Sequence, residues 1–157
     1  MHSTFSMKEL GLLNCFLGIS VTSSSLDYFL SQKKYATEIL VKAGMTNCKS
    51  SPSPMTLISS TYQEDFPFSQ PSLYRSLVDA LQYLTITRPD LAFAVNHACQ
   101  FLQTPLNSHF SLVKRLLRYL KGTLHLGLQF SPGPLTLNAF SDSDWAGCSL
   151  DQRSTTG

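Results

Sequence analysis

Apolar positions near the start of the chain form two short runs, one on each side of a serine-rich segment. The run from Leu12 to Val21 and the run Tyr28–Leu30 contain residue types that favour strands, and Ser23–Ser25 between them is typical of a turn. The pattern therefore predicts a β-hairpin.

The middle of the chain changes to helical spacing. Apolar side chains recur at a helical period from Gln32 to Ala43, and Gly44 is placed to end that helix. Residues 46–71, with four prolines and six serines, predict a long loop that is either a linker or a functional arm. Three more helices are then predicted, the second ended by Pro105 and the third running from Ser108 to Lys121. Their apolar stripes are Tyr74, Leu77, Leu81 and Leu84; Leu91, Val95, Ala98 and Leu102; and Leu112, Leu116, Leu117 and Leu120.

Alternation returns over residues 124–130 and 135–140, which predicts two strands joined by a Ser-Pro-Gly-Pro turn. The fold class is therefore α+β, with the helices grouped in the middle. Hydrophobic residues make up 43% of the 157 residues and charged residues 14%, which excludes a disordered tail and a polybasic arm. Four scattered cysteines and no membrane-length apolar run predict a soluble, intracellular chain with no membrane partner.

Two carboxylates follow the last predicted strand. Asp142 and Asp144 would point to one face if the strand continues, and carboxylate oxygens are the ligands that Mg²⁺ takes. Asp151 is a doubtful third member of this candidate metal site. An Asx-type turn after a strand explains the same spacing, so both interpretations stay open.

The third of these later helices has a basic side. Lys114, Arg115, Arg118 and Lys121 fall at i, i+1, i+4 and i+7, and no acidic residue lies between Asn107 and Gln129. Such a stripe can neutralise phosphates, although a merely solvated helix face has the same pattern. A formal net charge of only +2 argues against strong non-specific binding to nucleic acid.

Several short segments along the chain read as motifs. The main ones are Phe5-Ser-Met-Lys-Glu-Leu-Gly11, Cys15-Phe-Leu-Gly-Ile-Ser-Val21, Leu30-Ser-Gln-Lys-Lys-Tyr-Ala36, Tyr74-Arg-Ser-Leu-Val78, Thr87-Arg-Pro-Asp-Leu91, Leu117-Arg-Tyr-Leu-Lys-Gly-Thr123, Ser141-Asp-Ser-Asp-Trp-Ala-Gly147 and Arg153-Ser-Thr-Thr-Gly157. Taken together, these motifs resemble the junction between reverse transcriptase and RNase H in Copia-type retrotransposon Pol polyproteins. The resemblance runs through the whole chain in order, at compatible spacings.

The resemblance implies a layout in three parts. Residues 1–31 would be the end of the palm, with a hairpin like the primer grip, and residues 32–122 a helical thumb-like bundle and connection. Residues 123–157 would begin a truncated RNase H-like fold, with Asp142 as the first acid of an incomplete catalytic site. The parent enzyme would be an RNA-directed DNA polymerase with ribonuclease H activity that uses Mg²⁺, and the basic stripe would lie near an RNA/DNA duplex.

The Tyr-Xaa-Asp-Asp motif of such polymerases is absent, as are the later RNase H acids. The chain by itself is therefore expected to be a non-catalytic polyprotein fragment that needs no cofactor, with the remainder of the polyprotein as a partner. Two alternatives are a nucleic-acid-binding module that uses the basic helix and a helical protein-interaction scaffold. The resemblance leaves the compartment open between nucleus or cytoplasm and mitochondrion.

Overall fold

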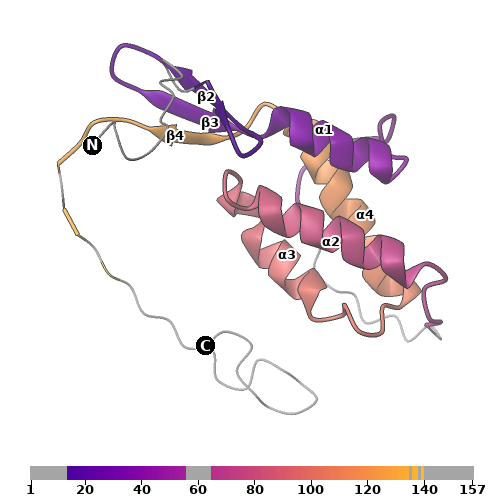
Figure 1. Cartoon of the computed structure of the whole chain (residues 1–157). Coiled ribbons are helices and arrows are strands. Elements are labelled where there is room, and N and C mark those ends of the chain that lie inside the picture. Colours follow the sequence, from indigo (N-terminus) through magenta and orange to yellow (C-terminus); the bar gives the residue numbers. More distant parts are fainter. Residues whose placement is uncertain (1–13, 56–64, 135, 138, 140–157) are drawn as a thin grey trace, which may run out of the picture.

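The computed structural model describes residues 14–55, 65–134, 136, 137 and 139 (Figure 1). Asp142, Asp144, Asp151 and most of the predicted strand over 135–140 lie outside these residues. The described part is a mixture of helices and strands, which confirms the α+β class. Its strands are β1 (Cys15–Phe16), β2 (Ile19–Ser23), β3 (Tyr28–Ser31) and β4 (Leu128–Phe130), and its helices are α1 (Lys33–Lys42), α2 (Pro71–Leu84), the 3₁₀ turn η1 (Pro89–Leu91), α3 (Ala92–Cys99) and α4 (Asn107–Gly122).

The predicted hairpin is present, but its first strand is divided. Leu17 and Gly18 both have positive φ, 47° and 75°, and fold the chain back so that β1 pairs with β2. Two consecutive residues with positive φ are what a two-residue hairpin turn of type I′ requires. The prediction of one strand over residues 12–21 is therefore wrong, because Gly18 serves as a turn residue. The serine-rich turn between β2 and β3 is confirmed, and Ser24 N–H donates to the carbonyl of Asp27 across it.

The fourth strand comes from the other end of the described chain. β4 pairs antiparallel with β3, with Phe130 opposite Tyr28 and Leu128 opposite Leu30, and completes a sheet of order β1-β2-β3-β4. The strand predicted over residues 124–130 begins only at Leu128, because the chain first turns after α4. Gly127 then approaches β3 so closely that a Cβ there would lie 2.3 Å from the carbonyl oxygen of Leu30.

Local sequence signals explain where the helices begin and end. Gly44 (φ 65°) follows α1, and the N–H groups of Gly44 and Met45 donate to the carbonyls of Val41 and Leu40, as in a Schellman cap. Pro71 and Pro89 open α2 and η1, where a missing N–H loses no hydrogen bond. All four predicted helices are present. α3 ends at Cys99, earlier than Pro105 suggests.

The hydrophobic core lies entirely between the helices. Tyr74 is fully buried there and donates its hydroxyl to the carbonyl of Ala98 at 2.8 Å. On α4 the buried stripe includes Val113, whereas the predicted Leu112 is only half-buried. No residue of the four strands is buried by the described part of the chain. The core consists of Ala36, Ile39, Leu40, Tyr74, Leu77, Val78, Leu81, Leu84, Leu91, Ala94, Val95, Ala98, Val113, Leu116, Leu117 and Leu120.

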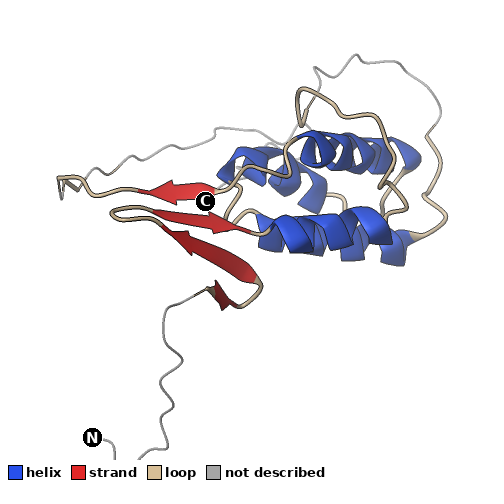
Figure 2. Cartoon of the chain, turned by 90° about the horizontal axis from the view of Figure 1, so that it is seen from above, coloured by secondary structure: helices blue, strands red, loops and turns tan. Residues whose placement is uncertain are grey.

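The sheet extends to one side of the helices instead of lying over them, as two views at right angles show (Figure 1) (Figure 2). The described ends of the long loop, in contrast, bind to the helices. Ser51 N–H donates to the carbonyl of Arg118 on α4, and Phe68 N–H donates to that of Pro105. None of the described helices is both long and apolar enough to cross a membrane. The three described cysteines, Cys15, Cys48 and Cys99, are free.

Candidate nucleic-acid interface

One side of α4 is buried in the core, and this determines which side of the helix is exposed. Val113, Leu116, Leu117 and Leu120 are buried against the other helices, so Lys114 and Arg118 on the other side of α4 are exposed. Residues 107–121 contain neither proline nor glycine, which keeps the helix regular over four turns. All four residues of the predicted basic stripe lie on this helix, and its role in binding nucleic acid stays a prediction.

Three of the four basic residues form one row along α4. At about 100° per residue, Lys114, Arg118 and Lys121 fall within about 60° around the axis of α4. Lys114 and Arg118 are exposed, whereas Arg115 and Lys121 are half-buried. From Lys114 to Lys121 the row is about 10 Å long, which is about three base-pair steps of a duplex.

No acid of the described residues forms an ion pair with this row. Within residues 14–55 and 65–134 the single ion pair joins Arg88 to Asp90, so none of the four bases is neutralised by an acid of the described chain. Two described acids contact α4 elsewhere: Asp90 accepts the hydroxyl of Tyr119 at 3.0 Å, and Asp65 accepts the N–H of Ser108 at the N-terminal end of the helix at 3.2 Å. Hydrogen bonds from Ser108, its side chain more than its backbone, lower the pKa of Asp65, so the carboxylate stays charged where the helix dipole favours it.

The basic side chains of α4 differ in the contacts that they make. The Nζ atom of Lys114 lies 4.9 Å from the centroid of the Phe110 ring, and Phe110 stacks on Phe68 at 4.1 Å. Such a cation–π contact holds the ammonium in place without neutralising it. The Nε atom of Arg115 is buried and has no hydrogen-bond partner among the described residues. Within the described residues, the side chains of Arg118 and Lys121 have neither a cation–π contact nor a buried nitrogen without a partner.

Lys49 is a further candidate that the sequence pattern does not reveal. The loop after α1 runs along α4, where Ser51 N–H donates to Arg118 O at 3.2 Å and Ser50 lies against Gly122. This path carries the exposed Lys49 to the C-terminal end of the basic row. Periodicity on one helix cannot indicate a base that reaches the same surface from a loop about 70 residues earlier.

His109 near the start of α4 adds little charge to this surface at neutral pH. The Nδ1 atom of His109 accepts the N–H of Leu106 at 3.0 Å, and its ring stacks on Phe101 at 3.7 Å. Burial lowers the pKa of His109, which favours the neutral imidazole. The predicted acidic site, Asp142 and Asp144, lies outside the described residues. Within the described residues no three His, Cys, Asp or Glu side chains gather to hold a metal ion.

Comparison with known proteins supplies the family. The family model described as reverse transcriptase (RNA-dependent DNA polymerase) matches residues 1–57. Over its whole length the chain is 51% identical to an uncharacterized mitochondrial protein of Arabidopsis thaliana, and 40% identical to the retrovirus-related Pol polyprotein from transposon RE2 of the same plant. The chain belongs to the family of Copia-type retrotransposon Pol polyproteins. The resemblance stated from the motifs is confirmed.

The chain matches only a segment of these Pol polyproteins. It spans 66% of the mitochondrial relative, 11% of the RE2 polyprotein and 13% of the Pol polyprotein from transposon TNT 1-94 of Nicotiana tabacum, to which it is 32% identical. No solved structure matches the chain. The described positions of this Pol segment therefore have to be interpreted from their own contacts.

Two of the motifs shared with Pol turn out to be structural in this fold. Arg75 donates from Nε to the carbonyl of Leu102 at 2.8 Å and from Nη2 to that of Gln103 at 3.1 Å, just beyond the end of α3. Arg88 is 3% exposed and faces the inside of the molecule. Neither arginine belongs to the basic row on α4, although both stand in segments that identify the family.

Proposed function

We propose that this Pol segment holds a nucleic-acid duplex against α4 and takes no chemical step itself. The observation that carries the proposal is the row of Lys114, Arg118 and Lys121 on a helix whose opposite face is buried in the core. The basic side chains of this row neutralise phosphates, and the release of counterions from the duplex drives association. The modest net charge of +2 favours weak binding that depends strongly on salt.

We further propose that the sheet packs against the remainder of the reverse transcriptase. Residues paired across neighbouring strands share one face, and one face of this sheet is almost entirely apolar. Phe16 and Phe130 on that face are 61% and 50% exposed, although large apolar side chains are usually covered in a finished sheet. The apolar face is made of Phe16, Ile19, Val21, Tyr28, Leu30, Leu128 and Phe130.

The duplex-holding role does not depend on Asp142 or Asp144. They stay predictions as Mg²⁺ ligands of the parent enzyme, as does the assignment of residues 123–157 to the start of an RNase H domain. The pairing of β4 with β3 puts residues 128–130 in one sheet with the N-terminal strands. We therefore propose that any RNase H fold of the parent enzyme begins after Phe130.

Duplex binding tests the proposed function. The affinity of the 157-residue chain for a fluorescein-labelled RNA/DNA duplex is measured by anisotropy between about 50 and 200 mM salt. The double variant Lys114→Ala/Arg118→Ala should bind at least fivefold more weakly, and its slope of log affinity against log salt should become shallower by about 2. The control Lys33→Ala/Lys34→Ala removes the same charge from exposed positions on α1 and should keep the wild-type slope.

Two results would contradict the proposal. Equal losses in both double variants would mean that only the net charge matters, and an unchanged slope in the α4 variant would remove α4 from the interface. Template-dependent nucleotide incorporation by the purified chain would show that its role is catalytic.

A further inference from the structure

The sheet and the helices are connected by the chain at two places. Ser31 of β3 is followed directly by Gln32 and α1, and Thr123 begins the turn that leads from α4 to β4. These two connections are about 90 residues apart in the sequence. In the folded chain both contact the same four residues, Thr87–Asp90, which lie between α2 and α3 and are called the joint loop below.

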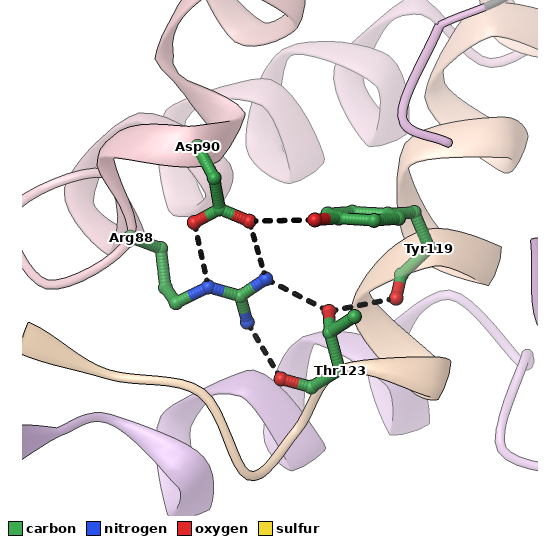
Figure 3. A network of polar contacts seen from close by, with 4 residues as sticks. All are labelled: Arg88, Asp90, Tyr119 and Thr123. Carbon is green, nitrogen blue, oxygen red and sulfur yellow. Dashed lines mark hydrogen bonds and ion pairs between the residues drawn. The ribbon is translucent and has the colours of Figure 1, made fainter. Parts of the chain in front are cut away.

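Arg88 of the joint loop holds the second connection (Figure 3). Its Nη1 donates to the backbone carbonyl of Thr123 at 2.9 Å, and its Nη2 donates to the Thr123 hydroxyl at 2.8 Å. The Thr123 hydroxyl in turn donates to the carbonyl of Tyr119 at 2.8 Å. Arg88 thus binds the residue at which α4 ends and the path to β4 begins.

Thr87 of the joint loop holds the first connection. Its hydroxyl donates to Oε1 of Gln32 at 2.8 Å, and both side chains are almost completely buried. Gln32 is the residue between β3 and the first turn of α1. A hydrogen bond between two buried side chains fixes their relative position, because breaking it leaves both groups without water.

Asp90 keeps the Arg88 guanidinium from turning away. Nε and Nη2 of Arg88 donate to the two carboxylate oxygens of Asp90, each at 2.8 Å, and the Tyr119 hydroxyl donates to Oδ2 of Asp90 at 3.0 Å. A bidentate pair of this kind has one orientation. Pro89 between the two residues adds a fixed φ, so the joint loop is stiff.

We propose that the joint loop sets the angle between the sheet and the helices, with Arg88 and Thr87 as its positioning residues. One stiff loop fixes both connections, so the sheet cannot rotate about either of them without breaking buried hydrogen bonds. Tyr83 makes one more polar contact with the sheet, donating its hydroxyl to the carbonyl of Leu17. That contact is exposed and involves a turn, so it does not fix an angle by itself.

Pulsed electron–electron double resonance, which measures the distribution of distances between two spin labels, tests this role on the 157-residue chain. One label is placed at Ser25→Cys in the β2–β3 turn and the other at Asn96→Cys on α3, both exposed positions, after the four native cysteines are changed to Ala. The variant Arg88→Gln should at least double the width of the label-to-label distance distribution. The control Arg75→Gln also removes an arginine that binds two carbonyls, but within the helices alone, and should keep the wild-type width.

The width separates positioning from general stabilisation. Broadening in Arg88→Gln and not in Arg75→Gln supports the proposal, whereas an unchanged width in Arg88→Gln, or equal broadening in both, overturns it. If Arg88→Gln does not fold, Thr87→Val and Thr123→Val, which remove one hydroxyl each, decide in the same way. The measurement uses no nucleic acid, so its failure would leave the duplex-holding role of α4 untouched.

Discussion

The helices and the sheet of this chain differ in how far their apolar side chains are buried. The helices enclose sixteen buried hydrophobic residues, while none of the four strands buries a side chain against the described part of the chain. Both regions are rich in apolar residues, so composition does not explain the difference. Helices bury their stripes against one another, whereas a single sheet needs a second layer. The helical part is therefore complete by itself, and the sheet is one half of a core.

Removing a core side chain should produce the largest effect. Leu81→Ala on α2 removes a side chain with 0% exposure and should lower the free energy of unfolding by about 3 kcal/mol. Leu26→Ala in the β2–β3 turn, where the side chain is 71% exposed, should change it by less than about 0.5 kcal/mol. Urea unfolding followed by circular dichroism measures both variants. Similar losses would mean that the sheet is as tightly packed as the helices.

A methyl group at Gly127 should disturb the sheet without disturbing the helices. Its Cβ would meet the Leu30 carbonyl oxygen at 2.3 Å and the Phe29 ring at 2.7 Å, so Gly127→Ala should separate β4 from β3. Overpacking of this kind costs about 1–3 kcal/mol. Hydrogen exchange should become faster in β3 and unchanged in α2. The control Gly133→Ala has open space around its Cβ, and β3 exchanging at the wild-type rate in Gly127→Ala would contradict the pairing.

The Arg88–Asp90 pair should make stability depend on acid pH. Hydrogen bonds from Arg88 lower the pKa of Asp90 from its ordinary value of 3.8 in the folded state. The ionised carboxylate therefore stabilises the fold above pH 3.8, and this contribution is lost as the pH falls through the folded-state pKa. The urea concentration at the unfolding midpoint should decrease as the pH is lowered below about 4, and this decrease should be smaller in Asp90→Asn. Asp79→Asn, at an exposed position on α2, serves as the control, and parallel curves for wild type and Asp90→Asn would refute the linkage.

Changing the apolar face of the sheet should have the smallest effect on stability. Phe130→Ser replaces a half-exposed ring, so the free energy of unfolding should stay within about 0.5 kcal/mol of the wild type. Binding of the dye ANS should decrease at the same time, because less apolar surface is open. A large loss of stability would show that Phe130 already packs against a part of this chain.

The sequence predicts the helices far better than the sheet. The stripe Tyr74, Leu77, Leu81 and Leu84 and the cap at Gly44 depend on neighbours within one or two turns, so a local pattern contains them. The turn at Leu17 is local, but it needs a positive φ at a leucine, which the residue type does not indicate. The register of β4 depends on β3, which lies about 100 residues away in the sequence. A strand that is one residue out of register would present its other face.

The same distinction holds for the candidate site. The spacing of Lys114, Arg118 and Lys121 predicts their common row, because all three lie on one helix. Lys49 and the contacts of Arg88 could not be predicted, since they depend on how a loop packs against α4. A sequence motif such as Thr87-Arg-Pro-Asp-Leu91 indicates the family without indicating which atoms its arginine binds.

The pairing of β3 with β4 also sets the order in which the chain can mature during translation. Tyr28 leaves the ribosome about 100 residues before its partner Phe130, which at about 5–20 residues per second is a delay of about 5–20 s. During that interval the outer edge of β3 has no strand beside it, and open edges invite pairing with other chains. α1, α2 and α3 are synthesised within that interval, but α4, which completes their core, is synthesised only just before β4. Synthesis rate, and not only stability, should therefore govern how much of this protein escapes aggregation.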